Sequence, residues 1–467
     1  MKKIKSFMLI ICSALLMLAG CQSSKSNSSN NSSSSNSTSS SNSSSSSEDI
    51  VELRFMFWGG IAEQQSVQYM VDKFNNENPN IKVKAEHVPD EYETRLVTLM
   101  ASGDLPDVAY VPEGLVLQWG IDGHIMDLTK YEKDYPELAS RIPETYLYYD
   151  EGKHLGNSTA IEVMNIYYNK DSFEKAGVEP PPTNIIDAWT WDEFLTAAKK
   201  LTIDRNGNNA LSPDFDPKNI QQFGIDTPTY WAAWYPFVRN NGGDIANEEG
   251  TEFTMNQPEA VEALQLLQDL IHKHHVAPTP TQQADMPETT MGLDTKRFAM
   301  LIDGQWSLND YKEMDVNFGI GVLPKMKVAA KSVTSAGATS IFSSTKHPEE
   351  ALKFYLYHND PEIVNLYEDG LWMPVQDKYY KDQKFTDKWL KDGVHPPEYK
   401  EAVIDYTLEG IYRNPAVTLK NWSAIRTEVF STMDLLWLGQ GSAQELMDKL
   451  SEHVNPLLKG RYPTRGE

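Results

Sequence analysis

Apolar and polar side chains alternate along residues 51–57, which predicts a strand that buries one of its faces. The chain then breaks at Trp58-Gly59-Gly60, and apolar residues recur at helical spacing through residues 67–74. After an Asn-Pro-Asn turn, residues 81–85 alternate again. This β-α-β order predicts two parallel strands joined by a helical crossover.

The same alternation of strand and helix patterns continues along the chain. Thr190 and Glu193 have the spacing of a capping box at the start of an amphipathic helix. Because strands and helices alternate over a chain of 467 residues, we expect an α/β protein, most simply with two α/β lobes. Further helices are predicted at 91–101, from Asn256 to Ile271 and from Pro348, and buried strands at 107–111, 298–302 and 318–323.

The N-terminus has the pattern of a targeting segment. Three lysines precede a run at 7–18 that is nearly all apolar, too short to span a bilayer comfortably and typical of a signal peptide. Leu18-Ala19-Gly20-Cys21 resembles the bacterial lipobox, so we expect a signal peptide at 1–20 and a lipid on Cys21. An ordinary signal peptide with an incidental cysteine is the alternative.

Residues 22–47 are almost entirely Ser and Asn, so they offer no apolar surface to bury and predict a disordered tether over 21–47. Lipid, tether and folded body together favour the outer face of a cell membrane, and a Gram-positive cell.

Charge and cysteine content narrow the class of protein. The net charge of −24 disfavours nucleic acid as a partner and favours a soluble monomer. The two cysteines are Cys12 and Cys21, so the predicted folded body cannot hold a disulfide framework or a cysteine metal site.

Several short runs, in order, resemble the extracellular solute-binding proteins of sugar ABC importers, the maltose-binding-protein class. Each run alone is weak, but their order and spacing together are specific. They are Pro106-Asp107-Val108, Tyr168-Asn169-Lys170-Asp171, Thr190-Trp191-Asp192-Glu193-Phe194, Phe298-Ala299-Met300, Asp303-Gly304-Gln305-Trp306, Gly321-Val322-Leu323-Pro324, Ser335-Ala336-Gly337-Ala338 and Lys346-His347-Pro348-Glu349-Glu350-Ala351.

The resemblance implies a two-lobed fold of the type II periplasmic-binding-protein kind, with discontinuous lobes that close on a ligand by hinge motion. It implies a sugar-binding protein rather than an enzyme, with an ABC permease and its ATPase as partners. The expected divisions are 48–162 and 337–372 in the first lobe, and 163–336 and 373–467 in the second.

Two candidate ligand-binding residues follow from the strand pattern. Trp58 and Glu113 come just after predicted strands, where open α/β sheets bind ligands. Lobe packing for Trp58 and a solvated surface acid for Glu113 remain the alternatives. Glu162 is a charge among apolar neighbours, which needs a reason if it is buried; an edge-strand acid that faces water is the other reading.

The resemblance adds further candidates. It places a ligand-binding acid at Glu162 and an aromatic platform before Asn241-Gly242-Gly243. It also implies a stacking indole after Asp303-Gly304, a close backbone approach at a glycine, and a lid near the last crossing. The platform consists of Tyr230, Trp231 and Trp234, and the stacking indole is Trp306, with Asp303 beside it as a further candidate. The glycine is Gly337, and the lid residue is Trp372. Gly59-Gly60 stands where the maltose binder has an Asp-Lys pair, so maltose specificity does not carry over.

No cofactor is expected. His272, His274 and His275 resemble a metal-binding cluster, but they fall at a helix end, where cations are favourable against the helix dipole, so a metal site there is disfavoured. Asp204, Asn206 and Asn208 have calcium-loop spacing, but the sixth and twelfth positions lack the glycine and glutamate of such loops. A turn is favoured there, with a structural calcium as the alternative.

Two other functions stay open from the residues. An anchored glycoside hydrolase also uses aromatic residues and carboxyls, and would need two carboxyls about 5–10 Å apart. A surface adhesin would gain no stability from a small molecule.

Overall fold

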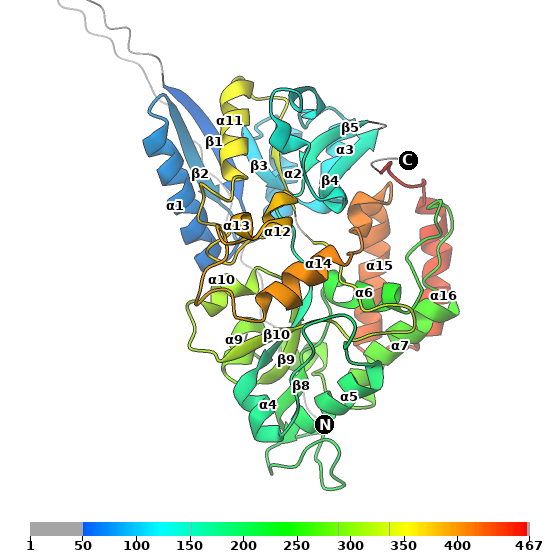
Figure 1. Cartoon of the computed structure of the whole chain (residues 1–467). Coiled ribbons are helices and arrows are strands. Elements are labelled where there is room, and N and C mark those ends of the chain that lie inside the picture. Colours follow the sequence, from blue (N-terminus) through cyan, green and yellow to red (C-terminus); the bar gives the residue numbers. More distant parts are fainter. Residues whose placement is uncertain (1–49, 151, 288, 336, 465–467) are drawn as a thin grey trace, which may run out of the picture. The chain divides into compact units, whose positions relative to one another are not determined.

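The computed structural model describes residues 50–464, apart from Glu151, Glu288 and Ala336. The expected signal peptide, the lipidated Cys21 and the tether lie outside these residues. The described body carries its helices and strands in two lobes (Figure 1). No helix within it combines the length and the apolar character needed to cross a bilayer.

The first lobe is built on a four-stranded sheet in the order β11-β3-β1-β2. The predicted parallel pair is confirmed, with Val51 opposite Ile81 at its start. The β1 strand also pairs in parallel with β3, while β11 runs antiparallel to β3. The elements are β1 (Val51–Phe57), β2 (Ile81–His87), β3 (Val108–Val111), β11 (Ala338–Ile341), α1 (Ile61–Glu77), α2 (Tyr92–Ser102), α3 (Glu113–Ile121), α11 (Pro348–His358) and the hairpin β4 (Tyr146–Asp150) with β5 (Lys153–Asn157).

The second lobe is built on a five-stranded sheet in the order β10-β6-β9-β8-β7. The β8 and β9 strands pair in parallel, and the other neighbours are antiparallel. Its strands are β6 (Asn165–Asn169), β7 (Ile203–Asp204), β8 (Ile220–Ile225), β9 (Phe298–Asp303) and β10 (Phe318–Gly321). Its helices are α4 (Lys170–Ala176), α5 (Trp191–Leu201), α6 (Trp231–Asn240), α7 (Pro258–His272), α8 (Pro280–Gln283), α9 (Thr289–Asp294), α10 (Ser307–Tyr311), α15 (Trp422–Trp437) and α16 (Ala443–Val454).

Local signals in the sequence set several of these elements. The capping box at the start of α5 is confirmed, because the Glu193 backbone N–H donates to Thr190 Oγ1 and the Thr190 backbone N–H donates to Glu193 Oε2 at 2.8 Å. Helix α7 begins at Pro258, two residues after the expected Asn256, because proline fits the first helical position.

Two large hydrophobic clusters form most of the core. One surrounds the first sheet and extends to Tyr167, Leu301 and Ile320 of the second sheet, and the other lies beneath α6, α7, α15 and α16. The segment from Met373 to Ile411, which includes α12 (Lys378–Lys381), α13 (Gln383–Thr386) and α14 (Tyr406–Leu408), contributes mostly to the first cluster. Helices α15 and α16 belong to the second cluster. The exact lobe divisions therefore stay predictions.

Three segments of the chain lie side by side between the two sheets. Ile161 bridges Met373, and Val163 bridges Thr334. The Ser335 backbone N–H donates to the Glu162 carbonyl at 2.8 Å. The chain thus passes between the two sheets through residues 161–164 and again through 332–335 and 337, and residues 371–373 lie against the first of these crossing segments.

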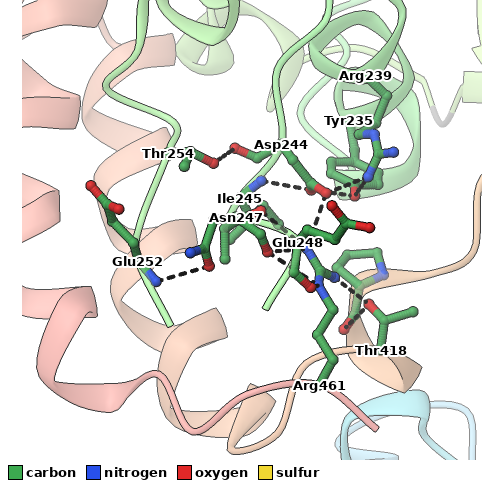
Figure 2. A network of polar contacts seen from close by, with 12 residues as sticks. Tyr235, Arg239, Asp244, Ile245, Asn247, Glu248, Glu252, Thr254, Thr418 and Arg461 are labelled. Carbon is green, nitrogen blue, oxygen red and sulfur yellow. Dashed lines mark hydrogen bonds and ion pairs between the residues drawn. The ribbon is translucent and has the colours of Figure 1, made fainter. Parts of the chain in front are cut away.

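A polar network ties the end of the described chain to the second lobe (Figure 2). Asp244 accepts from the Tyr235 hydroxyl at 2.8 Å, from Arg239, and from Arg461 at 3.2 Å. Arg461 also donates to the backbone carbonyls of residues 246–248. One carboxylate and one guanidinium therefore connect α6, the loop after it and the C-terminal segment.

Candidate functional site

A cleft of about 530 Å³ is lined by side chains from both lobes. Its wall combines nine aromatic rings with four glutamates and one arginine. The lining residues are Trp58, Glu63, Tyr92, Glu93, Tyr110, Pro112, Glu113, Gly114, Thr159, Glu162, Tyr230, Trp231, Trp306, Ser335, Gly337, Leu371, Trp372, Asn414, Ala416, Trp422, Arg426 and Phe430.

Trp58 and Gly337 fit together on the first-lobe side. Trp58 follows β1 and makes edge contacts with the rings of Tyr92 and Tyr110, at centroid distances of 5.1 and 4.9 Å. Its indole lies directly over Gly337, since a Cβ at that glycine would stand 2.1 Å from Trp58 Cη2. The glycine is thus required by the indole of Trp58.

Tyr230, Trp231 and Trp306 lie together on the second-lobe side. The Tyr230 ring is 45 % exposed and meets the Trp306 ring edge-on at 6.1 Å. The hydroxyl oxygens of Tyr230 and Ser335 share a hydrogen bond at 3.0 Å, which fixes the tyrosine beside a crossing segment. Trp231, at the start of α6, packs against Tyr230 with a centroid distance of 5.9 Å.

Two expected residues do not line this cleft. Trp234 is 1 % exposed and packs in the core of the second lobe, because the side of α6 that carries it faces inward. Asp303 lines a smaller adjoining cavity of about 290 Å³ together with Asp226, Tyr230 and Trp306. Burial raises the pKa of Asp303 to about 6, although the Gly304 N–H donates to it at 2.8 Å.

Trp372 lines the cleft but is almost fully buried. It is 3 % exposed and packs against Tyr110, His358 and Tyr367, with centroid distances of 5.9, 4.9 and 6.0 Å. In this structure it supports the cleft wall and does not cover the opening as the expected lid would.

Three carboxyl groups face one another in the cleft, those of Glu63, Glu113 and Glu162. Burial raises the pKa of Glu63 to about 8, with a further contribution from Asp310. Burial also holds the pKa of Glu162 well above its usual range, and the charges of Glu63 and Glu113 add to this. Ion pairs with Glu63 or Glu162 are absent among the described residues, so protonation is the available relief from charge repulsion.

Several cleft residues were missed by sequence reasoning. Glu63 stands in the first turn of α1, where an acid usually complements the helix dipole, and Tyr110 sits in a strand that reads as pure core. Arg426 of α15 binds Glu93 of α2 with both nitrogens, at 2.8 and 3.2 Å, and so joins the two lobes across the cleft. The signal available for Arg426 was its helical spacing from Trp422, which also lines the cleft.

The calcium-like loop satisfies its own aspartate. Both carboxylate oxygens of Asp204 accept N–H groups, from Asn206, Asn208 and Asp216 at 2.8 to 3.0 Å. Because donors already point at both oxygens, this loop is built as a turn. The described residues contain no group of three or more His, Cys, Asp or Glu side chains that could hold a metal ion. His272 instead meets the Trp437 carbonyl at 2.9 Å.

Comparison with known proteins gives one consistent family. The family described as "Bacterial extracellular solute-binding protein" matches residues 58–362. The chain is 26 % identical to the multiple sugar-binding protein of Streptococcus mutans over 360 residues, covering 71 % of this chain and 79 % of that protein. It is 25 % identical to the arabinooligosaccharide-binding protein of Halalkalibacterium halodurans over 340 residues, covering 70 % of each.

Solved structures show the same architecture. An ABC substrate-binding protein from Listeria monocytogenes, in complex with cycloalternan, superposes with a TM-score of 0.74 at 25 % identity, covering 87 % of this chain and 99 % of that one. The maltose/maltodextrin-binding domain from Bdellovibrio bacteriovorus, bound to maltotriose, gives a TM-score of 0.69 at 20 % identity, with coverage of 87 % and 99 %. The expected two-lobed type II periplasmic-binding-protein fold is thereby confirmed.

Proposed function

Since this chain belongs to the bacterial extracellular solute-binding protein family, we propose that it captures a di- or oligosaccharide outside the cell and delivers it to an ABC importer. The relatives named above that bind sugars support the class of ligand, and the family, one of binding proteins rather than enzymes, supports transport without catalysis.

The observation that carries the proposal is the aromatic and carboxyl lining of the cleft. Sugars have apolar ring faces and a rim of hydroxyls, which match indole planes and carboxyl or amide groups respectively. The cleft volume of about 530 Å³ lies within the range of small-molecule sites. The proposed ligand-binding residues are Trp58, Glu63, Glu113, Glu162, Tyr230, Trp231, Trp306, Gly337 and Trp372.

Closure follows from the placement of these residues. Trp58 and Glu63 belong to the first lobe, whereas Trp231 and Trp306 belong to the second. A ligand that touches both groups makes its full set of contacts only when the lobes are closed, so it shifts the population toward that state. The permease and its ATPase would then recognise the closed form.

The remaining parts of the proposal concern the membrane. A lipid on Cys21 and the Ser/Asn-rich segment would hold the body on the outer face of the cell membrane, as a monomer beside its importer. Metabolic labelling with a palmitate analogue tests this, because a Cys21→Ser variant would lose the label.

A thermal-shift screen across mono- and oligosaccharides tests the function. A ligand present at a hundred times its Kd adds about 2.7 kcal/mol to the free energy of unfolding. For a folded body of this size, that corresponds to a rise in Tm of about 3 °C. Trp306→Ala should remove the shift, whereas Tyr69→Ala, on the exposed side of α1, should keep it. Cleavage of the sugars during incubation would favour an anchored glycoside hydrolase instead, and no shift with any sugar would favour an adhesin.

A further inference from the structure

Two carboxyl groups of the cleft, those of Glu63 and Glu162, have no basic side chain against them in the described part of the chain. The basic residue in the cleft wall is Arg426, and both of its terminal nitrogens are taken by Glu93. Glu113 adds a third carboxyl to the same cavity. The ionisable side chains that face the ligand space are therefore predominantly acidic.

The backbone around these carboxyls places both of them in the cleft. Glu63 folds back over Gly59, where a Cβ would stand 2.1 Å from Glu63 Oε2. Glu162 lies on a crossing segment whose carbonyl accepts the Ser335 N–H at 2.8 Å. The missing side chain at Gly59 thus leaves room for the Glu63 carboxyl, and a backbone hydrogen bond fixes the segment that carries Glu162. A partly buried carboxyl held in this way needs a proton or a cationic partner.

Among the described residues, the charges that act most strongly on these two carboxyls belong to other acids. Glu63, Glu113 and Asp303 act on Glu162, and Asp310 acts on Glu63. The phenols of Tyr110 and Tyr167 feel the same negative charges. The environment therefore favours a positive charge brought in from outside.

The cleft also offers cation-binding surface that is not charged. Trp58 and Trp306 line it, and indole faces attract ammonium groups. The Tyr110 hydroxyl is buried in the cleft wall at 1 % exposure and has no hydrogen-bond partner among the described residues. The hydroxyl oxygen of Tyr110 and the carboxyl oxygens of the cleft can all accept hydrogen bonds, which suits a ligand rich in N–H and O–H donors.

We infer that the ligand is a sugar carrying a protonated amino group, of the glucosamine type, whose ammonium binds between Glu63 and Glu162 beside the indoles of the cleft. This inference rests on the proposed function and narrows its substrate class. An ammonium supplies three donors and no acceptor, so it matches a site made of carboxyl oxygens and aromatic faces. Its positive charge also favours the ionised form of both carboxyls, so that they lose their protons when the ligand binds.

Calorimetric titration with three β-1,4-linked trisaccharides of equal length tests the inference. They differ only at C2, which carries an ammonium in the glucosamine form, an acetamide in the N-acetylated form and a hydroxyl in the glucose form. At pH 7 we expect the amino form to bind at least tenfold more tightly than either neutral form. Its affinity should fall as salt rises, because the contact is between charges.

Variants identify the groups responsible. Glu162→Gln and Glu63→Gln should each weaken binding of the amino form about tenfold or more and change binding of any neutral sugar less than threefold. Glu349→Gln removes the same charge from the exposed start of α11 and should leave both affinities unchanged. Tm values of all variants show whether they fold, and either of the two cleft variants suffices.

The outcomes separate this inference from the proposed function. Equal or tighter binding of a neutral sugar, in the matched series or in a wider neutral panel, overturns the amino-sugar assignment and leaves sugar capture standing. That result would mean that the carboxyls hold protons and donate to hydroxyls. Failure of every sugar to bind overturns both.

Discussion

The fit between Gly337 and Trp58 gives a sharp test of the cleft. In Gly337→Ala the new methyl would stand 2.1 Å from Trp58 Cη2 and 2.6 Å from Cζ2, well inside normal van der Waals contact. The indole cannot retreat, because the rings of Tyr92 and Tyr110 pack against it. We therefore expect the indole to be pushed into the ligand space.

The cost should resemble that of overpacking a core, about 1–3 kcal/mol. If most of it appears as lost ligand contact, affinity falls roughly 5- to 150-fold, since 1.4 kcal/mol is a factor of ten. Calorimetric titration with the sugar identified by the thermal screen measures this, and urea unfolding measures any share carried by the fold. Gly60→Ala is the matched control, because a methyl at Gly60 meets nothing within 4 Å.

A double-mutant cycle decides whether the indole is the cause. In a Trp58→Ala background the methyl at residue 337 has room, so adding Gly337→Ala should change affinity less than twofold. Wild-type affinity and stability in the single Gly337→Ala variant would refute the reasoning. So would an effect of equal size with and without the indole.

Three other outcomes are expected. Arg426→Ala removes the ion pair that joins the lobes, so affinity for the sugar should fall two- to fivefold, which corresponds to about 0.5–1 kcal/mol for a partly exposed pair. Unchanged affinity together with an unchanged X-ray scattering profile would contradict this. Asp244→Ala removes an acceptor shared by the Tyr235 hydroxyl, the Arg239 and Arg461 guanidinium groups and the Ile245 N–H, and should lower the free energy of unfolding by about 1.5–3 kcal/mol in urea. A smaller loss would mean that this network does not stabilise the fold. The folded-state pKa of Glu63, about 8, lies above its unfolded value, so the folded state binds more protons than the unfolded state between these two values. The free energy of unfolding, measured in urea, should therefore decline from about pH 4.5 to pH 8, and Glu63→Gln should flatten that decline.

The helices and strands could be predicted well from the sequence because their signals are local. Alternation set β1 and β2, and the capping box at Thr190 set the start of α5. The family motifs then supplied the two-lobed arrangement, which no local pattern contains.

The cleft was harder to predict because orientation is decided by packing. Trp231 and Trp234 are three residues apart on one helix, and only the packed structure shows that the first reaches the cleft and the second the core. Glu63 resembled an ordinary first-turn acid, and Tyr110 resembled a core residue of its strand. Both acquire their roles from neighbours distant in the chain, such as Glu162, which a one-dimensional pattern cannot reveal.

Residues of the crossing segments line the cleft, so the proposed ligand site lies next to the hinge about which the lobes would turn. A rigid arm that turns about a fulcrum moves little near it and most at its far end. A displacement of a fraction of an ångström at Glu162 or Gly337 would therefore become a larger displacement at the outer elements of the lobes, such as α4. An importer that binds the outer ends of the lobes would therefore distinguish the ligand-bound form from the empty form without contacting the ligand.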